Sequence, residues 1–194
     1  MRLANYIYLR NFLSEKECKA IIREGQKGLH KATIYNEENK SVENSNRKTN
    51  ISFLRQGGSV DNTLKKVIDG VCDTALKHYG FSITDIEAIQ YAEYEVDMFY
   101  GWHTDSGSSL KQTWKRDISA SLILNEKKEY TGGSLQMVFA NNISKNNVVT
   151  PQDVENQEQG TLIVFPSSMI HQVTPVMTGI RKSLVLWSFS NATD

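Results

Sequence analysis

Cysteine, net charge and long apolar runs are all scarce in this chain, and each scarcity excludes a class of protein. Only two of the 194 residues are cysteines, Cys18 and Cys72, and each stands at an apolar position of a helix-like pattern. Cysteines in such positions commonly pack as small hydrophobes. We therefore expect buried thiols rather than a disulfide, and a reducing, cytoplasmic compartment.

The charges balance, with 22 basic and 22 acidic residues. Nucleic acid and anionic membranes usually bind a basic face, and the stretch Lys111 to Arg116 carries only three positive charges. No stretch approaches the roughly 18 apolar residues that span a bilayer, and Met1 to Asn5 lacks the apolar core of a signal peptide. We expect neither a nucleic-acid nor a membrane partner.

Two helical patterns are present in the first part of the chain. Ser14 and Glu17 form a capping box, Ser-x-x-Glu, before an apolar face that runs to Gly25 or Gly28. A second pattern covers Asp61 to Tyr79, where Gly80 follows as a C-terminal cap. At this length we expect one domain over 1–194, with a helical part over about 1–80.

Beyond Gly80 the pattern changes to short β segments and turns, which indicates a mainly β core over about 81–191. We expect strands at Tyr6–Leu9, Thr49–Leu54, Ile86–Val96, Tyr100–Thr104, Ile118–Leu124, Ser134–Phe139, Thr161–Phe165 and Ser183–Phe189. Two polar stretches, Lys31–Thr49 and Asn141–Gln159, are expected to be loops. Helices followed by many short strands predict an α+β, mainly β fold, a sandwich or jelly roll buttressed by N-terminal helices.

His103 and Asp105 stand two residues apart in one of these segments, so on a strand their side chains share one face. His171 can complete a set of two imidazoles and one carboxylate, which leaves open positions on an octahedral metal and is typical of non-haem Fe(II) oxygenases. Arg181 follows ten residues later and suits the far carboxylate of a dicarboxylic co-substrate. A lone His-x-Asp also occurs by chance, and the simple alternative is a hydrogen-bonded surface pair.

Three neighbouring features favour the metal site over that alternative. An aromatic-rich stretch, Gln90 to Trp102, precedes the His-x-Asp pair. An apolar strand that ends in a turn, Gly160 to Ser167, precedes His171. Arg181 begins another apolar strand.

Eight segments then follow one another in a recognisable order: Asn11–Ser14, Arg47–Thr49, Tyr94–Asp105, Ser121–Asn125, Tyr130–Leu135, Gly160–Ser167, His171–Val176 and Gly179–Arg181. Together they resemble the prolyl 4-hydroxylase-type branch of the 2-oxoglutarate/Fe(II) dioxygenases, including the small bacterial and phage members called PKHD-type hydroxylases. The resemblance covers nearly the whole chain. It implies a double-stranded β-helix, or jelly roll, as the core.

Carried over residue by residue, the resemblance implies that His103, Asp105 and His171 bind Fe(II) and form the catalytic centre. Arg181 resembles the cation that holds the distal carboxylate of 2-oxoglutarate, a place where collagen-type members have lysine. Tyr94 matches a tyrosine that helps to hold 2-oxoglutarate, with a core aromatic as the alternative. A small residue in place of Asp105 would free a position for halide, so Asp105 favours hydroxylation.

Other candidates are expected to serve packing or solvent roles. Lys182 should face away from Arg181, because strand side chains alternate. Trp102 and Trp187 are expected to pack rather than react. His30 and His78 match no motif of the resemblance.

The resemblance implies an enzyme that uses Fe(II), 2-oxoglutarate and O2, is supported by ascorbate, and releases succinate and CO2. It suggests a prolyl residue in a protein or peptide as substrate, over which Lys31–Thr49 either closes as a lid or stands as a plain surface loop. A free amino acid, a small metabolite and a non-proline side chain stay open as substrates, and so does the oligomeric state. A nucleic-acid dealkylase should show a basic groove, and a non-catalytic jelly-roll binding module has no reason to keep the ligands and Arg181 together.

Overall fold

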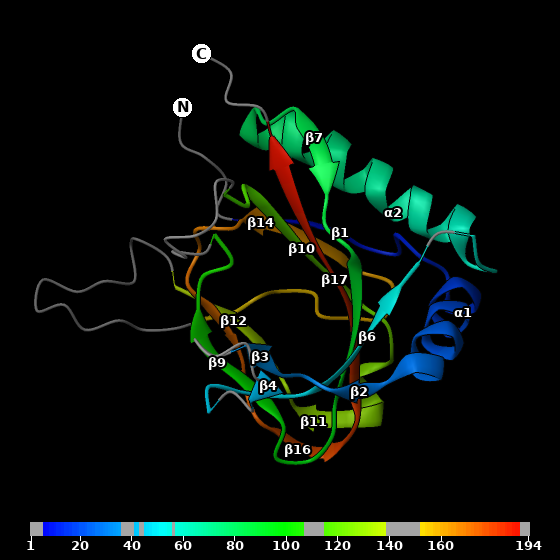
Figure 1. Cartoon of the computed structure of the whole chain (residues 1–194), viewed down its shortest axis with the longest axis vertical. Coiled ribbons are helices and arrows are strands. Elements are labelled where there is room, and N and C mark those ends of the chain that lie inside the picture. The colour runs from blue at the N-terminus through cyan, green and yellow to red at the C-terminus, as the bar shows by residue number, and fades with distance from the viewer. Residues whose placement is uncertain are drawn as a thin grey trace, which may run out of the picture.

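The computed structural model describes residues 6–35, 41–42, 45–55, 57–106, 115–138 and 152–190. Within this part of the chain, most strands belong to two sheets, one of eight strands and one of five (Figure 1). Both are antiparallel at every pairing, as expected for a sandwich or jelly roll. The predicted mainly β fold is confirmed.

The larger sheet has the strand order β1-β14-β10-β17-β8-β6-β2, and β7 pairs with the far part of β17. Its strands are β1 (Ile7–Leu9), β14 (Leu162–Pro166), β10 (Ile118–Ile123), β17 (Arg181–Ser190), β8 (Ile89–Tyr94), β6 (Asn50–Leu54), β2 (His30–Lys31) and β7 (Ile83–Ile86). Strands distant in sequence are therefore neighbours in the sheet, which requires long crossovers.

The smaller sheet has the order β13-β12-β15-β9-β5, and two strand pairs stand beside it. Its strands are β13 (Gln152–Asp153), β12 (Leu135–Met137), β15 (His171–Val173), β9 (Phe99–His103) and β5 (Arg47–Lys48). The separate pairs join β11 (Tyr130–Gly132) to β16 (Val176–Gly179), and β3 (Ile34–Tyr35) to β4 (Ser41–Val42).

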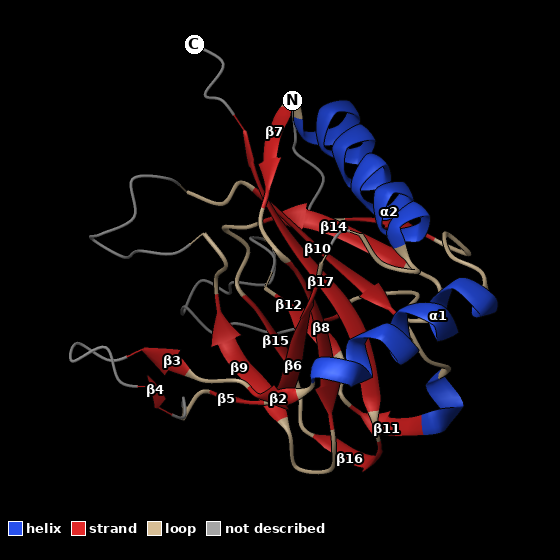
Figure 2. Cartoon of the chain, turned by 45° about the vertical axis from the view of Figure 1, so that its right-hand side comes forward, coloured by secondary structure: helices blue, strands red, loops and turns tan. Residues whose placement is uncertain are grey.

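Two helices pack on one side of the larger sheet (Figure 2). Helix α1 (Glu15–Gly25) begins with the predicted capping box, in which the Ser14 hydroxyl accepts from the Glu17 amide and the Glu17 carboxylate accepts from the Ser14 amide. A 3₁₀ turn, η1 (Gln26–Gly28), extends it.

Helix α2 (Asp61–Thr74) continues as a π-helical turn, η2 (Ala75–Tyr79), and ends at Gly80 with φ 75°. Glycine tolerates this left-handed conformation, so the predicted cap is confirmed. None of the helices in the described ranges is long and apolar enough to cross a membrane.

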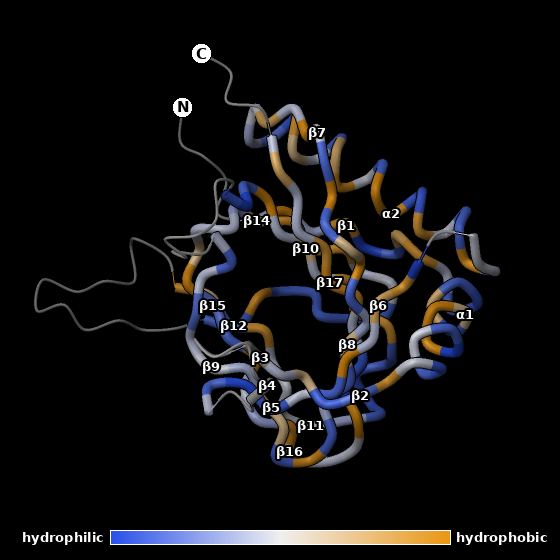
Figure 3. Tube along the Cα trace, viewed as in Figure 1, coloured by the Kyte–Doolittle hydropathy of each residue, from blue (hydrophilic) through white to orange (hydrophobic). Residues whose placement is uncertain are grey.

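The larger sheet separates two apolar cores because its side chains alternate between its faces. In β14, Leu162 and Val164 pack toward the helices, whereas Ile163 and Phe165 pack between the sheets. Figure 3 shows the matching mixture of hydrophobic and hydrophilic positions along α1 and α2. One face of the sheet thus anchors the helices, and the other is available for a site between the sheets.

Several boundaries differ from those expected. The expected strand Ile86–Val96 is two strands, β7 and β8, which pair with different parts of β17. The expected loop Lys31–Thr49 contains short strands in its described parts, and β5 completes the smaller sheet. Only the end of Asn141–Gln159 lies within the described residues. Both cysteines are free, although Cys72 is only half-buried.

Gly25 lies where α1 comes closest to the larger sheet, and this contact generates a prediction. A Cβ atom at Gly25 would lie 2.3 Å from Cγ of Tyr91, a fully buried residue whose hydroxyl donates to Glu93. Although alanine suits a helix better than glycine by up to about 1 kcal/mol, the clash should dominate. We expect Gly25→Ala to lower the free energy of unfolding by about 1–3 kcal/mol, as overpacked cores do.

Urea unfolding monitored by circular dichroism measures this change. Gly28→Ala is the matched control, because a Cβ atom there meets Ser52 at 3.7 Å, an ordinary contact. Equal stability of the two variants would contradict this account of the helix–sheet contact.

Candidate active site

Three side chains with metal-binding atoms meet between the two sheets. His103 ends β9, His171 begins β15, and the two are direct partners in the smaller sheet. Asp105 lies in the turn after β9, where its amide donates to the Ser167 carbonyl at 2.9 Å. One ligand atom from each of His103, Asp105 and His171 lies within 4.8 Å of the others.

Backbone carbonyls orient both imidazoles. The Nδ1 atom of His103 lies 2.8 Å from the Gly101 carbonyl oxygen, and Nδ1 of His171 lies 2.9 Å from that of Met169. Because a carbonyl only accepts, each Nδ1 is the donor, and a neutral ring then presents Nε2 with a free lone pair. These Nε2 atoms lie 3.5 Å from the two different oxygens of Asp105.

The electrostatics favour an ionised Asp105 carboxylate. Burial raises the pKa of Asp105, but hydrogen bonding and Coulombic attraction from His103 and His171 in their protonated forms outweigh burial, so this pKa lies below its usual range. Burial lowers the pKa of His171, against the opposing effect of Asp105. A carboxylate and two neutral imidazoles are the protonation states that bind a divalent metal.

A β-bulge brings Tyr100 to the same side as His103. The register between β15 and β9 shifts, since His171 pairs with His103 but Val173 pairs with Tyr100. The step of two residues from His171 to Val173 thus lies opposite a step of three residues from Tyr100 to His103, which turns both side chains inward. The two rings stack with centroids 3.5 Å apart and planes 10° apart.

Arg181 projects into the same cavity from the larger sheet and is only 1% exposed. Its Nη1 donates to the Ser183 hydroxyl at 2.9 Å, while Nε and Nη2 are buried without a hydrogen-bond partner. The Asn125 side chain fixes the backbone on both sides of Arg181, because it donates to the Ile180 carbonyl and accepts from the Lys182 amide, each at 2.8 Å. A buried cation with unsatisfied donors is thus held in place, ready for an anion.

Tyr94 lies beside Arg181 as its direct partner on β8, so the two side chains share a face. The guanidinium carbon of Arg181 is 5.4 Å from the centre of the Tyr94 ring. Alternate residues of β17 line the cavity, namely Arg181, Ser183, Val185 and Trp187. Leu184 and Leu186 pack toward the helices, and the same alternation turns Lys182 away from the cavity.

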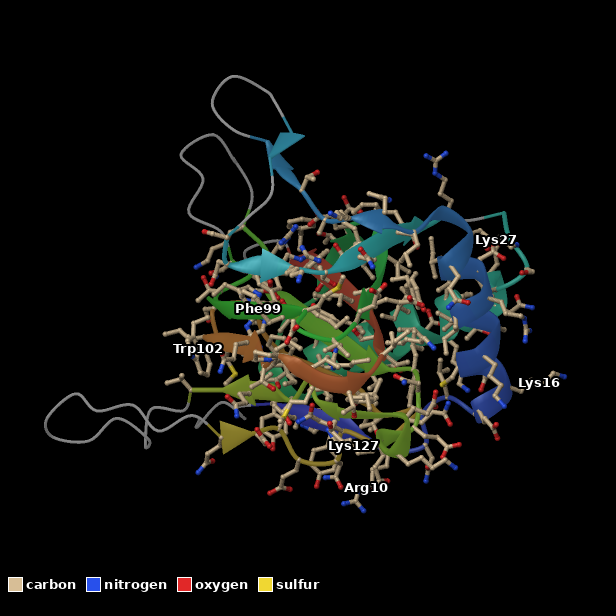
Figure 4. All side chains as sticks on the ribbon, turned by 90° about the horizontal axis from the view of Figure 1, so that it is seen from below. Arg10, Lys16, Lys27, Phe99, Trp102 and Lys127 are labelled. Carbon is tan, nitrogen blue, oxygen red and sulfur yellow. The ribbon has the colours of Figure 1, made fainter. Side chains whose placement is uncertain are left out.

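The remaining candidates lie as follows. Trp187 is buried at the cavity wall, and Arg116 covers its ring at 4.2 Å. Trp102 is 38% exposed and points outward from the smaller sheet (Figure 4). His30 and His78 are exposed and outside the cavity lining. Among the described residues, no second group of three such metal-binding side chains occurs.

Two cavity residues lacked a clear signal in the sequence. Tyr100 reaches the site only because of the bulge, which no residue type in β9 announces. Arg47 lines the cavity from β5, in a stretch expected to be mostly loop. Its motif, Arg47–Thr49, matched a core strand in the resemblance, which was the available hint.

The chain is similar in sequence to one family model and to several curated proteins. Residues 89–189 match the family model of the 2OG-Fe(II) oxygenase superfamily. A PKHD-type hydroxylase of Gloeothece citriformis is 29% identical over 141 residues, 73% of this chain and 60% of that protein. The PKHD-type hydroxylase YbiX of Escherichia coli O1:K1 / APEC is 33% identical over 107 residues, 54% of this chain and 44% of that protein. The chain spans about half the length of the curated relatives it matches.

Solved structures share the fold at lower identity. A Pseudomonas putida prolyl-4-hydroxylase superposes with a TM-score of 0.71 at 22% identity, covering 97% of this chain and 94% of that one. A Trichoplax adhaerens prolyl hydroxylase in complex with a hypoxia inducible factor peptide gives 0.68 at 20% identity, covering 96% and 84%. The family model matches more than half of the sequence, and this chain belongs to the 2OG-Fe(II) oxygenase superfamily.

Proposed function

We propose that this chain is an Fe(II)- and 2-oxoglutarate-dependent dioxygenase whose iron is held by His103, Asp105 and His171. The observation that carries the proposal is the meeting of their ligand atoms within 4.8 Å, with both imidazoles oriented by backbone carbonyls. Two imidazoles and one carboxylate suit Fe(II) and leave positions for other ligands. No further protein ligand is required.

Arg181 would bind the distal carboxylate of 2-oxoglutarate. Its Nε and Nη2 are buried donors without partners, and a planar guanidinium pairs with a carboxylate through two parallel hydrogen bonds. Tyr94, buried beside Arg181, would help to hold 2-oxoglutarate on the same side of the cavity. When bound, the iron and co-substrate supply the oxidation: one oxygen atom of O2 enters a substrate C–H bond as hydroxyl, the other enters succinate, and CO2 leaves.

The protein's own contribution is orientation and exclusion of water. His103 and His171 are fixed through Nδ1, and the backbone amides of Asp105 and Ser106 both donate to the Ser167 carbonyl. Phe165 stands edge-on to His171 with centroids 4.9 Å apart and is buried. Such fixed groups reduce the reorganisation that binding and reaction require.

We propose a prolyl residue in a protein or peptide as the substrate. Support comes from the fold shared with prolyl hydroxylases, one of which was solved with a peptide, and from the physics of proline, whose ring fixes φ near −65° and leaves little freedom to lose. Closure of Lys31–Thr49 over the peptide stays a prediction, since part of that segment lies outside the described residues.

The first of three predictions about the proposed function concerns the metal. Asp105→Ala should weaken Fe(II) binding by more than about a hundredfold, since even changes to groups behind metal ligands cost 10–100-fold. It should also abolish succinate formation. Metal affinity is measured by anaerobic titration. Asp153→Ala, an exposed acid on β13, is the control. Unchanged affinity in both Asp105→Ala and His171→Ala would refute the ligand assignment.

The second prediction concerns the co-substrate. A buried carboxylate without its cation typically costs about 3–5 kcal/mol, so Arg181→Ala should raise the 2-oxoglutarate concentration needed for half-maximal turnover by a few hundredfold or more. Iron affinity should change little, and Lys182→Ala should resemble the unmodified protein because Lys182 faces away. A sensitive Lys182 with a silent Arg181 would show that the assignment of the two residues is reversed.

The third prediction tests the substrate. Peptides and cell lysate are incubated with the protein, Fe(II), 2-oxoglutarate and ascorbate, and products that gain one oxygen are fragmented in a mass spectrometer. We expect the oxygen on proline rings. Oxygen found only on free amino acids, nucleobases or other side chains would overturn the substrate while leaving the iron and 2-oxoglutarate assignments intact.

A further inference from the structure

The cavity contains more unsatisfied donors than 2-oxoglutarate would use. Besides Arg181, the buried side-chain atoms without partners include Nε of Arg47 and Nε1 of Trp187, and both residues line the cavity. Neither nitrogen can accept a hydrogen bond. A ligand that brings acceptors would therefore be favoured beside the co-substrate, because a buried donor left unpaired costs free energy.

Arg47 lies on the sheet that faces Arg181. It pairs with Tyr100 across β5 and β9, and its guanidinium carbon is 4.7 Å from the centre of the Tyr100 ring. That ring stacks directly on His103. The Tyr100 ring thus lies between Arg47 and His103, one of the proposed iron ligands. Arg47 reaches the cavity from the smaller sheet, whereas Arg181 reaches it from β17 in the larger sheet.

Arg47 also has no ion-pair partner among the described residues, unlike the other arginine near this wall. Arg116 is paired with Glu87 through two hydrogen bonds of 2.6 and 2.7 Å, so its charge is neutralised where it stacks on Trp187. Within the described ranges, no carboxylate pairs with Arg47 in this way. Its charge is available to a ligand, and its position beside a half-buried ring weakens competition from water.

The sum of the charges in the cavity with Fe(II) and 2-oxoglutarate bound also points to Arg47. The charges of Fe(II) and of the 2-oxoglutarate dianion cancel, and Asp105 balances Arg181. The imidazoles are neutral when they bind metal. One positive charge, that of Arg47, is left for the substrate to balance.

We propose that Arg47 forms a carboxylate subsite for the substrate, so that the hydroxylated residue carries, or adjoins, a carboxylate. This inference rests on the proposed function and narrows its substrate class. Arginine suits the role because its planar fork can donate two hydrogen bonds to one carboxylate. The carboxylate can be the α-carboxylate of a C-terminal residue or of a free amino acid. It can also be the acidic side chain of the residue that follows the hydroxylated one in the substrate.

Matched pairs of probes distinguish these sources. Acetyl-proline is compared with acetyl-prolinamide, free proline with prolinamide, and acetyl-Pro-Glu-amide with acetyl-Pro-Gln-amide. Binding is measured by calorimetry on the protein loaded with 2-oxoglutarate and with Zn(II) in place of iron, so that no turnover is needed. In at least one pair, we expect the probe with the carboxylate to bind about tenfold to a hundredfold more tightly than the probe with the amide, as for charge-assisted hydrogen bonds. The pair that responds identifies the source.

Variants assign this preference to Arg47. Arg47→Ala should reduce the preference to within about threefold, and Arg47→Gln should do the same while retaining bulk and a donor, in case the alanine variant folds poorly. Lys48→Ala is the matched control: it removes an equal charge from the neighbouring exposed residue and should retain the preference. A preference that survives in Arg47→Gln, or disappears equally in Lys48→Ala, would overturn the assignment.

Equal binding of all carboxylates and amides to the unmodified protein, or no binding of either, would also overturn the subsite. Succinate formation by the iron-loaded protein is measured in parallel. Succinate without a carboxylate preference refutes the subsite and leaves the proposed function standing. A carboxylate preference without succinate refutes the proposed function and leaves the subsite.

Discussion

The buried carboxylate of Asp105 is the constraint on which the rest of the site depends. Its side chain is only 5% exposed, and an isolated carboxylate in such a place would take up a proton. Two imidazoles beside it keep its pKa low, and they can do so only because β9 and β15 are direct neighbours. The turn that follows β9 is hydrogen-bonded to Ser167, the residue directly after β14. The position of one carboxylate therefore links both sheets.

The two faces of the larger sheet divide stability from chemistry. Its outer face joins α1 and α2 through an apolar core, and the close approach at Gly25 sets how near the first helix can lie. Its inner face carries Arg181 and Ser183 among apolar neighbours. A buried arginine is costly unless other interactions compensate, and the outer core supplies stability without placing apolar groups where a ligand must bind.

Local signals in the sequence predicted much of this fold, and long-range pairing accounts for what they missed. The capping box at Ser14 and the glycine at position 80 fix helix ends through nearby atoms, so both could be predicted. The spacing of His103 and Asp105 likewise follows from strand geometry. The division of Ile86–Val96 into β7 and β8 depends on β17, almost a hundred residues away, and the bulge that brings Tyr100 inward depends on β15. Arg47 was hidden for the same reason, because a two-residue strand is defined by its partner rather than by its own residues.

The walls of the cavity differ in how firmly their donors are held, which bears on what each can recognise. Arg181 is fixed by Ser183 and by the Asn125 bridge, and Trp187 is covered by Arg116, which Glu87 holds in turn. Groups fixed in this way suit a ligand of constant shape, such as a co-substrate. Arg47 is held by a two-residue edge strand and one aromatic ring. A less constrained cation can adjust to its partner. Under the proposed assignments, Arg181 would give the co-substrate a rigid binding group and Arg47 would give the substrate a more adaptable one.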